Sequence, residues 1–167
     1  LALAALAGCS KKEEVPASAA AAPAAAAAPA DKLHIGFVYV SPIGDGGWTY
    51  QHDLGRKAIQ EKFGDKIETS FVESVPESAD AERVLRDMTS QGKQLIFATS
   101  FGYQEFVQKA AAELPQVKFE HATGYKQAPN VATYDTKTFE GAYLAGIVAG
   151  GMSKTKTIGV VASVPIP

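Results

Sequence analysis

The sequence has few of the residues that a disulfide, a metal cluster or a nucleic-acid surface would need. Only one of its 167 residues is cysteine, which excludes an internal disulfide and a cysteine-based zinc cluster within this sequence. Its 16 basic and 18 acidic residues give a net charge of -2, and the basic residues are scattered. This distribution argues against a nucleic-acid partner. No apolar run reaches the ~18 residues that a membrane-spanning helix needs.

Motifs of common enzymes are also missing. The three histidines, His34, His52 and His121, lack the paired spacing of metal ligands, so we predict no metal site. His121 ends a predicted strand near the expected ligand site and is expected in the core or at the sheet edge, with a ligand contact as the alternative. The sequence has no G-x-S-x-G turn and no P-loop, and residues 44–47 (GDGG) are too short and too acidic to hold a dinucleotide. We therefore predict no catalytic residues and no cofactor.

The composition changes twice near the N-terminus. Residues 1–9 (LALAALAGC) are apolar and end in small residues, like the end of a secretory signal. Residues 6–9 resemble a bacterial lipobox, which predicts a lipid anchor on Cys9 and a place on the periplasmic side of the cell envelope; a buried cysteine is the alternative. Residues 10–30 are rich in alanine and proline, which predicts a semi-extended tether, with a partner-binding segment as the alternative. The folded part is expected at residues 31–167.

The folded part alternates between predicted strands and helices. Runs of β-branched and aromatic residues predict strands, whereas apolar residues that recur every three or four positions predict helices. This alternation predicts an α/β fold with a doubly wound, mainly parallel sheet. The small residues of the last helix (FEGAYLAGIVAGGM) predict close packing on the sheet or on another helix. Strands are expected at residues 33–40, 66–72, 94–98, 117–122, 131–134 and 157–163, and helices at 48–63, 79–91, 104–114 and 138–152.

Three loops follow the carboxyl ends of predicted strands, where open parallel sheets bind ligands. They are residues 41–50, 99–103 and 123–125, and each contains aromatic and small polar residues. Such residues suit a flat ligand with hydrogen-bonding groups.

Four blocks of the sequence resemble the basic membrane protein family. They are residues 37–56 (FVYVSPIGDGGWTYQHDLGR), 99–103 (TSFGY), 119–125 (FEHATGY) and 140–146 (EGAYLAG). Members of this family are substrate-binding lipoproteins of ABC importers, similar to the purine nucleoside receptors. The resemblance implies a type I periplasmic binding protein with two α/β lobes joined by a hinge. Residues 31–167 would be its N-terminal lobe, truncated near the hinge and without the second lobe.

The resemblance also implies a purine site. Trp48 would stack on the base, and Asp45 would accept hydrogen bonds or organise its loop; packing and turn formation are the alternatives for these two residues. Nucleoside-binding members have asparagine and aspartate where this sequence has Thr49 and Thr123, which favours a nucleobase such as adenine over a nucleoside. Phe101 is equally consistent with simple packing. The expected ligand-binding residues are Asp45, Trp48, Thr49, Tyr50, Ser100, Phe101 and Thr123.

The implied function is the capture of a purine nucleobase or nucleoside for import. Its partners would be ABC permease subunits, and the lipid anchor would attach the protein to the membrane. Two alternatives stay open: a membrane-tethered sensor that uses the same lobe with another partner, and a truncated α/β enzyme.

Overall fold

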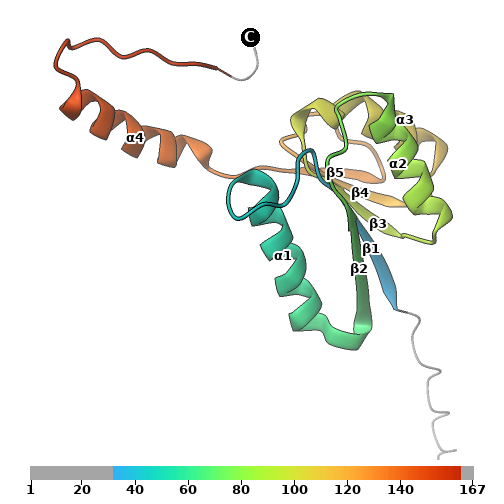
Figure 1. Ribbon diagram of the computed structural model, residues 1–167. Helices are drawn as coiled ribbons and strands as arrows, with labels where there is room; N and C mark the ends of the chain where they lie inside the picture. Colours follow the sequence, from blue (N-terminus) through green and yellow to red (C-terminus); the bar gives the residue numbers. More distant parts are fainter. Residues whose placement is uncertain (1–31, 163–167) are drawn as a thin grey trace, which may run out of the picture. The chain divides into compact units, whose positions relative to one another are not determined.

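The computed structural model describes residues 32–162 of the chain; the predicted anchor residue Cys9, the predicted tether at residues 10–30 and residues 163–167 lie outside them. The described part is built on a five-stranded parallel sheet with the strand order β2-β1-β3-β4-β5 (Figure 1). This arrangement confirms the predicted α/β fold with a parallel sheet. The strands are β1 (Leu33–Val38), β2 (Ile67–Val72), β3 (Leu95–Ala98), β4 (Lys118–Ala122) and β5 (Val131–Tyr134).

Helices cover both faces of the sheet. Helix α1 (Trp48–Phe63) lies on one face, and α2 (Ala79–Ser90) and α3 (Gln104–Glu113) lie on the other (Figure 1). The strand order explains this division. The chain moves outward from β1 to β2 through α1, then crosses back past β1 to β3 through α2, so right-handed crossovers place the two helices on opposite faces. Short 3₁₀ turns occur at Gly64–Lys66 and Phe101–Tyr103.

The core has two layers because successive strand residues point to opposite faces of the sheet. In β1, Ile35 and Phe37 pack on the α1 side, whereas Val38 packs on the side of α2 and α3. Gly36 also faces α2, and a Cβ atom there would lie 2.7 Å from the sulfur of Met88. Glycine at this position therefore allows α2 to approach the central strand closely.

Helix α2 illustrates how local sequence defines the element boundaries. The Ser78 hydroxyl accepts a hydrogen bond from the backbone N–H of Asp80 at 3.3 Å, which caps the first turn. Asp80 and Glu82 place negative charge at the positive end of the helix dipole. Gly92 adopts a φ of 84° just after the helix, a conformation that glycine accommodates without strain.

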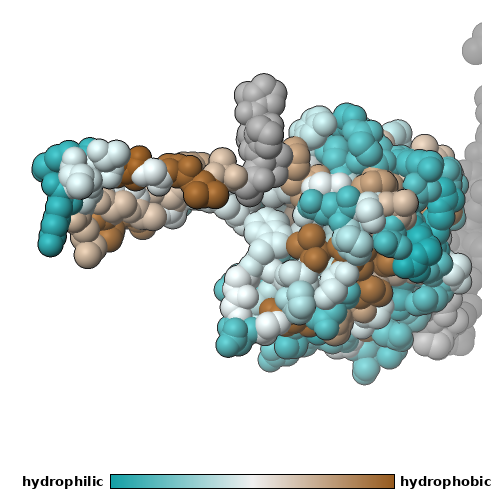
Figure 2. Space-filling model, turned by 45° about the horizontal axis from the view of Figure 1, so that its top comes forward, coloured by the Kyte–Doolittle hydropathy of each residue, from teal (hydrophilic) through white to brown (hydrophobic). Residues whose placement is uncertain are grey.

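Two predictions for the C-terminal part are wrong. Helix α4 (Thr138–Met152) forms as predicted, but none of its residues is buried, so its small residues do not mark packing on the sheet. Apolar side chains are exposed along it (Figure 2), and none of the described residues covers them. Residues 157–162 form no strand, contrary to the strand predicted there, because they pair with no neighbouring strand in the described part of the chain.

Candidate functional site

The strand order reverses between β1 and β3. The chain leaves β1 toward β2 on one side and later returns to β3 on the other, so the loops after β1 and β3 diverge. Ligands of open α/β sheets commonly bind in the crevice at such a reversal. Trp48, at the start of α1, joins the two loops, since its indole N–H donates a hydrogen bond of 2.6 Å to the Thr99 carbonyl oxygen. The indole is thereby held in place at the reversal.

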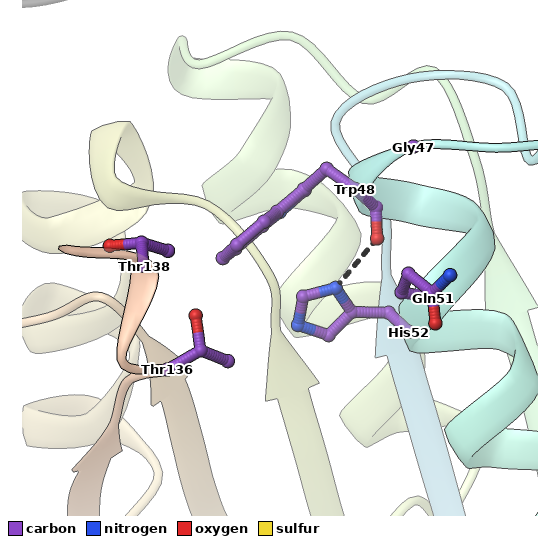
Figure 3. A pocket seen from close by; sticks show the side chains of 6 residues that line it. All are labelled: Gly47, Trp48, Gln51, His52, Thr136 and Thr138. Carbon is purple, nitrogen blue, oxygen red and sulfur yellow. Dashed lines mark hydrogen bonds between the residues drawn. The ribbon is translucent and has the colours of Figure 1, made fainter. Parts of the chain in front are cut away.

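A hollow of about 390 Å³ lies beside this indole. Its volume falls within the ~300–1,000 Å³ typical of small-molecule sites. The lining residues come from the start of α1 and from the segment after β5, which are distant in the sequence (Figure 3). They are Gly47, Trp48, Gln51, His52, Thr136 and Thr138.

The Trp48 ring offers an aromatic surface to the hollow. Its side chain remains 36% exposed although one edge is hydrogen-bonded to Thr99. Figure 3 shows the indole extending from α1 toward the side on which Thr138 lies, with the His52 ring next to it. The centroids of the Trp48 and His52 rings are 4.6 Å apart, and their planes are tilted by 57°. The hollow therefore combines an aromatic face with polar groups, which suits binding by stacking and hydrogen bonding.

Two hydrogen bonds to neighbouring elements hold the loop after β1 in place. The hydroxyls of Ser41 and Thr49 are hydrogen-bonded at 2.7 Å, and the backbone N–H of Ile43 donates to the Glu73 carboxylate at 2.9 Å. Gly47 has a φ of 91° at the point where the loop enters α1, which favours glycine there. Thr49 is only 2% exposed, so its side chain supports the loop instead of lining the hollow.

Asp53 anchors the beginning of α1 to the sheet. Its carboxylate is 1% exposed and accepts hydrogen bonds from Arg56 at 2.7 Å and Lys57 at 2.9 Å, with the Tyr39 hydroxyl at 3.4 Å. Burial is the largest single effect on its pKa and raises it, but the hydrogen bonds and charges of Lys57 and Arg56 together outweigh burial and hold the pKa below its usual range. The ionised carboxylate thus links α1 to Tyr39, the residue that follows β1.

A second polar network holds the loop after β3. The Glu77 carboxylate accepts hydrogen bonds from the Ser100 hydroxyl and, at 3.1 Å, from the backbone N–H of Gly102. The Ser100 carbonyl oxygen accepts a 2.6 Å hydrogen bond from Nε2 of His121, which is fully buried as expected for a core or edge residue. Burial lowers the pKa of His121, although the hydrogen bond to Ser100 opposes this effect. Ser100 and His121 therefore hold the loop in shape.

Among the predicted ligand-binding residues, Trp48 is the one that lines the hollow. Asp45 is exposed in the loop before α1, and Tyr50 and Phe101 are half-buried outside the lining. Thr123, with a φ of 60°, donates its hydroxyl to the preceding carbonyl oxygen at 2.6 Å. The three predicted loops thus lie at one edge of the sheet, but their polar groups do not all meet at one site.

Sequence reasoning missed Gln51, His52, Thr136 and Thr138. One signal was available, because His52 follows Trp48 by four residues in a predicted helix and must share its face. No local signal indicates Thr136 or Thr138, since they reach the hollow through the path of the chain after β5.

Two negative findings apply to residues 32–162. No group of three or more His, Cys, Asp or Glu residues there could hold a metal ion. None of the helices in this range is long and apolar enough to cross a membrane.

The chain is similar in sequence to known proteins of transport systems. A family model described as PnrA-like ABC transporter substrate-binding protein matches residues 32–167. The chain is 51% identical over 137 residues to a purine-binding protein of Brucella abortus, covering 82% of this chain and 39% of that protein. It is 40% identical over 137 residues to a Haloferax volcanii protein named as an ABC transporter glucose-binding protein, covering 82% of this chain and 34% of that protein.

A solved structure shows the same fold. A solute-binding protein of an ABC transporter system from Aeropyrum pernix matches with a TM-score of 0.61 and 28% identity, covering 71% of this chain and 32% of that chain. This likeness confirms the predicted periplasmic-binding-protein fold class. The chain spans well under half the length of each of these relatives.

Proposed function

Because this chain belongs to the PnrA-like family of ABC transporter substrate-binding proteins, we propose that it captures a purine and delivers it to a permease for import. The family consists of ABC transporter substrate-binding proteins. The observation that carries the proposal is the position of Trp48. Its indole is held by Thr99 at the reversal of strand order and presents an aromatic surface to a hollow of about 390 Å³.

Stacking is the interaction that this arrangement favours. A purine is flat and aromatic, and base–aromatic stacking contributes about 1–3 kcal/mol in other proteins. The hydrogen bond from the indole to Thr99 restricts the ring, so less conformational freedom is lost when a ligand stacks on it. The relative from Brucella abortus, at 51% identity, is named as a purine-binding protein, which supports a purine for this chain as well.

A nucleobase such as adenine fits the residues better than a nucleoside. The resemblance implies that nucleoside receptors hold their ligand with an asparagine and an aspartate at the positions of Thr49 and Thr123. Here the Thr49 hydroxyl is bonded to Ser41 at 2.7 Å, and the Thr123 hydroxyl is bonded to a backbone carbonyl at 2.6 Å. Neither threonine supplies the carboxylate or amide that would hold ribose hydroxyls.

The full-length protein would close the site with a second lobe. The hollow is open on one side, and the chain spans 39% of the length of the Brucella relative. A helix that is apolar on all sides, as α4 is, normally lies within a protein core. We assign residues 31–167 to the N-terminal part of the protein, and the exposed apolar side chains of α4 to the contact with the second lobe.

The same reasoning extends to location. Substrate-binding proteins of ABC transporters typically work in the periplasm or outside the cell. A lipid on Cys9 and the tether at residues 10–30 would hold this one near its permease on the periplasmic side of the membrane.

Titration calorimetry of the full-length protein without its signal would test this function. Adenine, adenosine and glucose form the panel, because one relative is named as a glucose-binding protein. We expect one adenine per protein, bound at least about tenfold more tightly than adenosine, a difference of about 1.4 kcal/mol. Binding of glucose without binding of either purine would overturn the proposal.

A further inference from the structure

His52 lies in the same hollow as Trp48, one helical turn further along α1. The two rings are 4.6 Å apart between centroids, and the ring of Tyr134 in β5 lies 6.2 Å from that of His52. His52 is half-buried. Its ring is therefore restricted in orientation, although it lies beside an open hollow.

A single hydrogen bond determines which nitrogen of this ring carries the proton. Nδ1 of His52 lies 3.0 Å from the carbonyl oxygen of Trp48. A carbonyl oxygen can only accept, so Nδ1 must be the donor, and Nε2 of the neutral ring is left with a lone pair. Figure 3 shows Nε2 on the side of the ring that faces Thr136 across the hollow. Among residues 32–162, Nε2 makes no hydrogen bond of its own.

We propose that Nε2 of His52 is the acceptor that determines ligand specificity: it takes a hydrogen bond from an exocyclic amine of the bound base. This inference rests on the proposed function, in which the base stacks on Trp48. A base with a carbonyl group in place of the amine would bring a lone pair of its oxygen against the lone pair of Nε2. Neither atom would then have a hydrogen bond. The hollow therefore selects an aminopurine such as adenine over an oxopurine such as hypoxanthine, whose ring system is otherwise the same.

Gln51 does not provide the same selection. It also lines the hollow, but a glutamine side chain can turn either its oxygen or its nitrogen toward a ligand. Of these two neighbours, only His52 has its acceptor defined by a hydrogen bond to the backbone. Discrimination by a defined acceptor is strong because the wrong ligand leaves buried polar groups unpaired.

The test compares adenine and hypoxanthine by titration calorimetry with the full-length protein and its His52→Phe variant. Phenylalanine keeps a ring beside Trp48 but removes both nitrogens. We expect the wild type to prefer adenine by about tenfold or more, and the variant to lose about tenfold in adenine affinity. Hypoxanthine affinity should change little, so that the preference largely disappears.

Two further variants serve as a rescue and as a control. His52→Gln restores an acceptor and should recover part of the adenine preference. His34→Phe is the matched control, because His34 lies at the start of β1, at the opposite end of that strand from the hollow, beside Glu68. It should bind both bases like the wild type.

The outcomes separate this inference from the proposed function. If His52→Phe keeps the wild-type preference, or loses equal affinity for both bases, His52 does not select the amine and the inference is wrong, although purine binding stands. If the wild type binds neither base, the proposed function fails and the inference fails with it.

Discussion

Replacement of Trp48 by alanine removes the aromatic surface on which the proposed site depends. Base–aromatic stacking is worth about 1–3 kcal/mol, which corresponds to about a 5- to 150-fold loss of adenine affinity. Trp48→Phe should lose less, because it keeps a ring but cannot make the 2.6 Å hydrogen bond to the Thr99 carbonyl oxygen. Because that hydrogen bond is present with and without ligand, its contribution of about 0.5–1.5 kcal/mol should be lost from the free energy of unfolding, whereas adenine affinity should fall by less than in Trp48→Ala.

Titration calorimetry of the full-length protein measures both variants. Phe63→Ala is a suitable control, because Phe63 is 46% exposed and ends the same helix far along the chain from Trp48. Thermal unfolding without ligand should show that all three variants remain folded. Adenine affinity within twofold of the wild type in Trp48→Ala would refute the stacking argument and assign Trp48 a structural role.

Other residues give three further predictions. Asp53→Asn should lower the free energy of unfolding by about 1–3 kcal/mol at pH 7, measured by denaturant unfolding. Because the folded pKa of Asp53 is depressed, its stabilising effect is present above about pH 4 and is lost as the pH falls further, so the two proteins should converge in acid; a constant difference would contradict this. In Gly102→Ala, the new Cβ would overlap the Glu77 carboxylate and should displace it, at a cost of about 1–3 kcal/mol. The same change in a Glu77→Ala background should cost much less, and equal costs in a double-mutant cycle would argue against the contact. Cys9→Ser should release the protein from membranes in a fractionation experiment, and continued membrane association would refute the lipid anchor.

The sequence predicts the sheet and its helices well because their signals are local. The apolar spacing of residues 48–63 and the glycine that follows predict α1 with the boundaries that the structure shows. The five strands of the sheet are also found, with ends that differ by at most two residues. Helix α4 is found as a helix, but its packing is not, because small residues indicate close contact without indicating the partner.

The site is predicted less completely because it depends on helix phase and on distant contacts. Trp48 is found through a resemblance, yet the adjacent Thr49 points inward to Ser41 and cannot be placed without knowing the rotation of α1. Ser100 has the residue type of a ligand contact, but its groups are occupied by Glu77 and His121, and that network joins two loops and strand β4. Such pairings depend on the fold and not on sequence spacing.

The central claim is that the hollow beside Trp48 is a purine site. A crystal structure of the full-length protein grown with saturating adenine tests it most directly. We expect the base to lie flat against the indole at about 3.5–4 Å, with its amine directed at Nε2 of His52. Adenine bound elsewhere, with no contact to the Trp48 ring, would contradict the account.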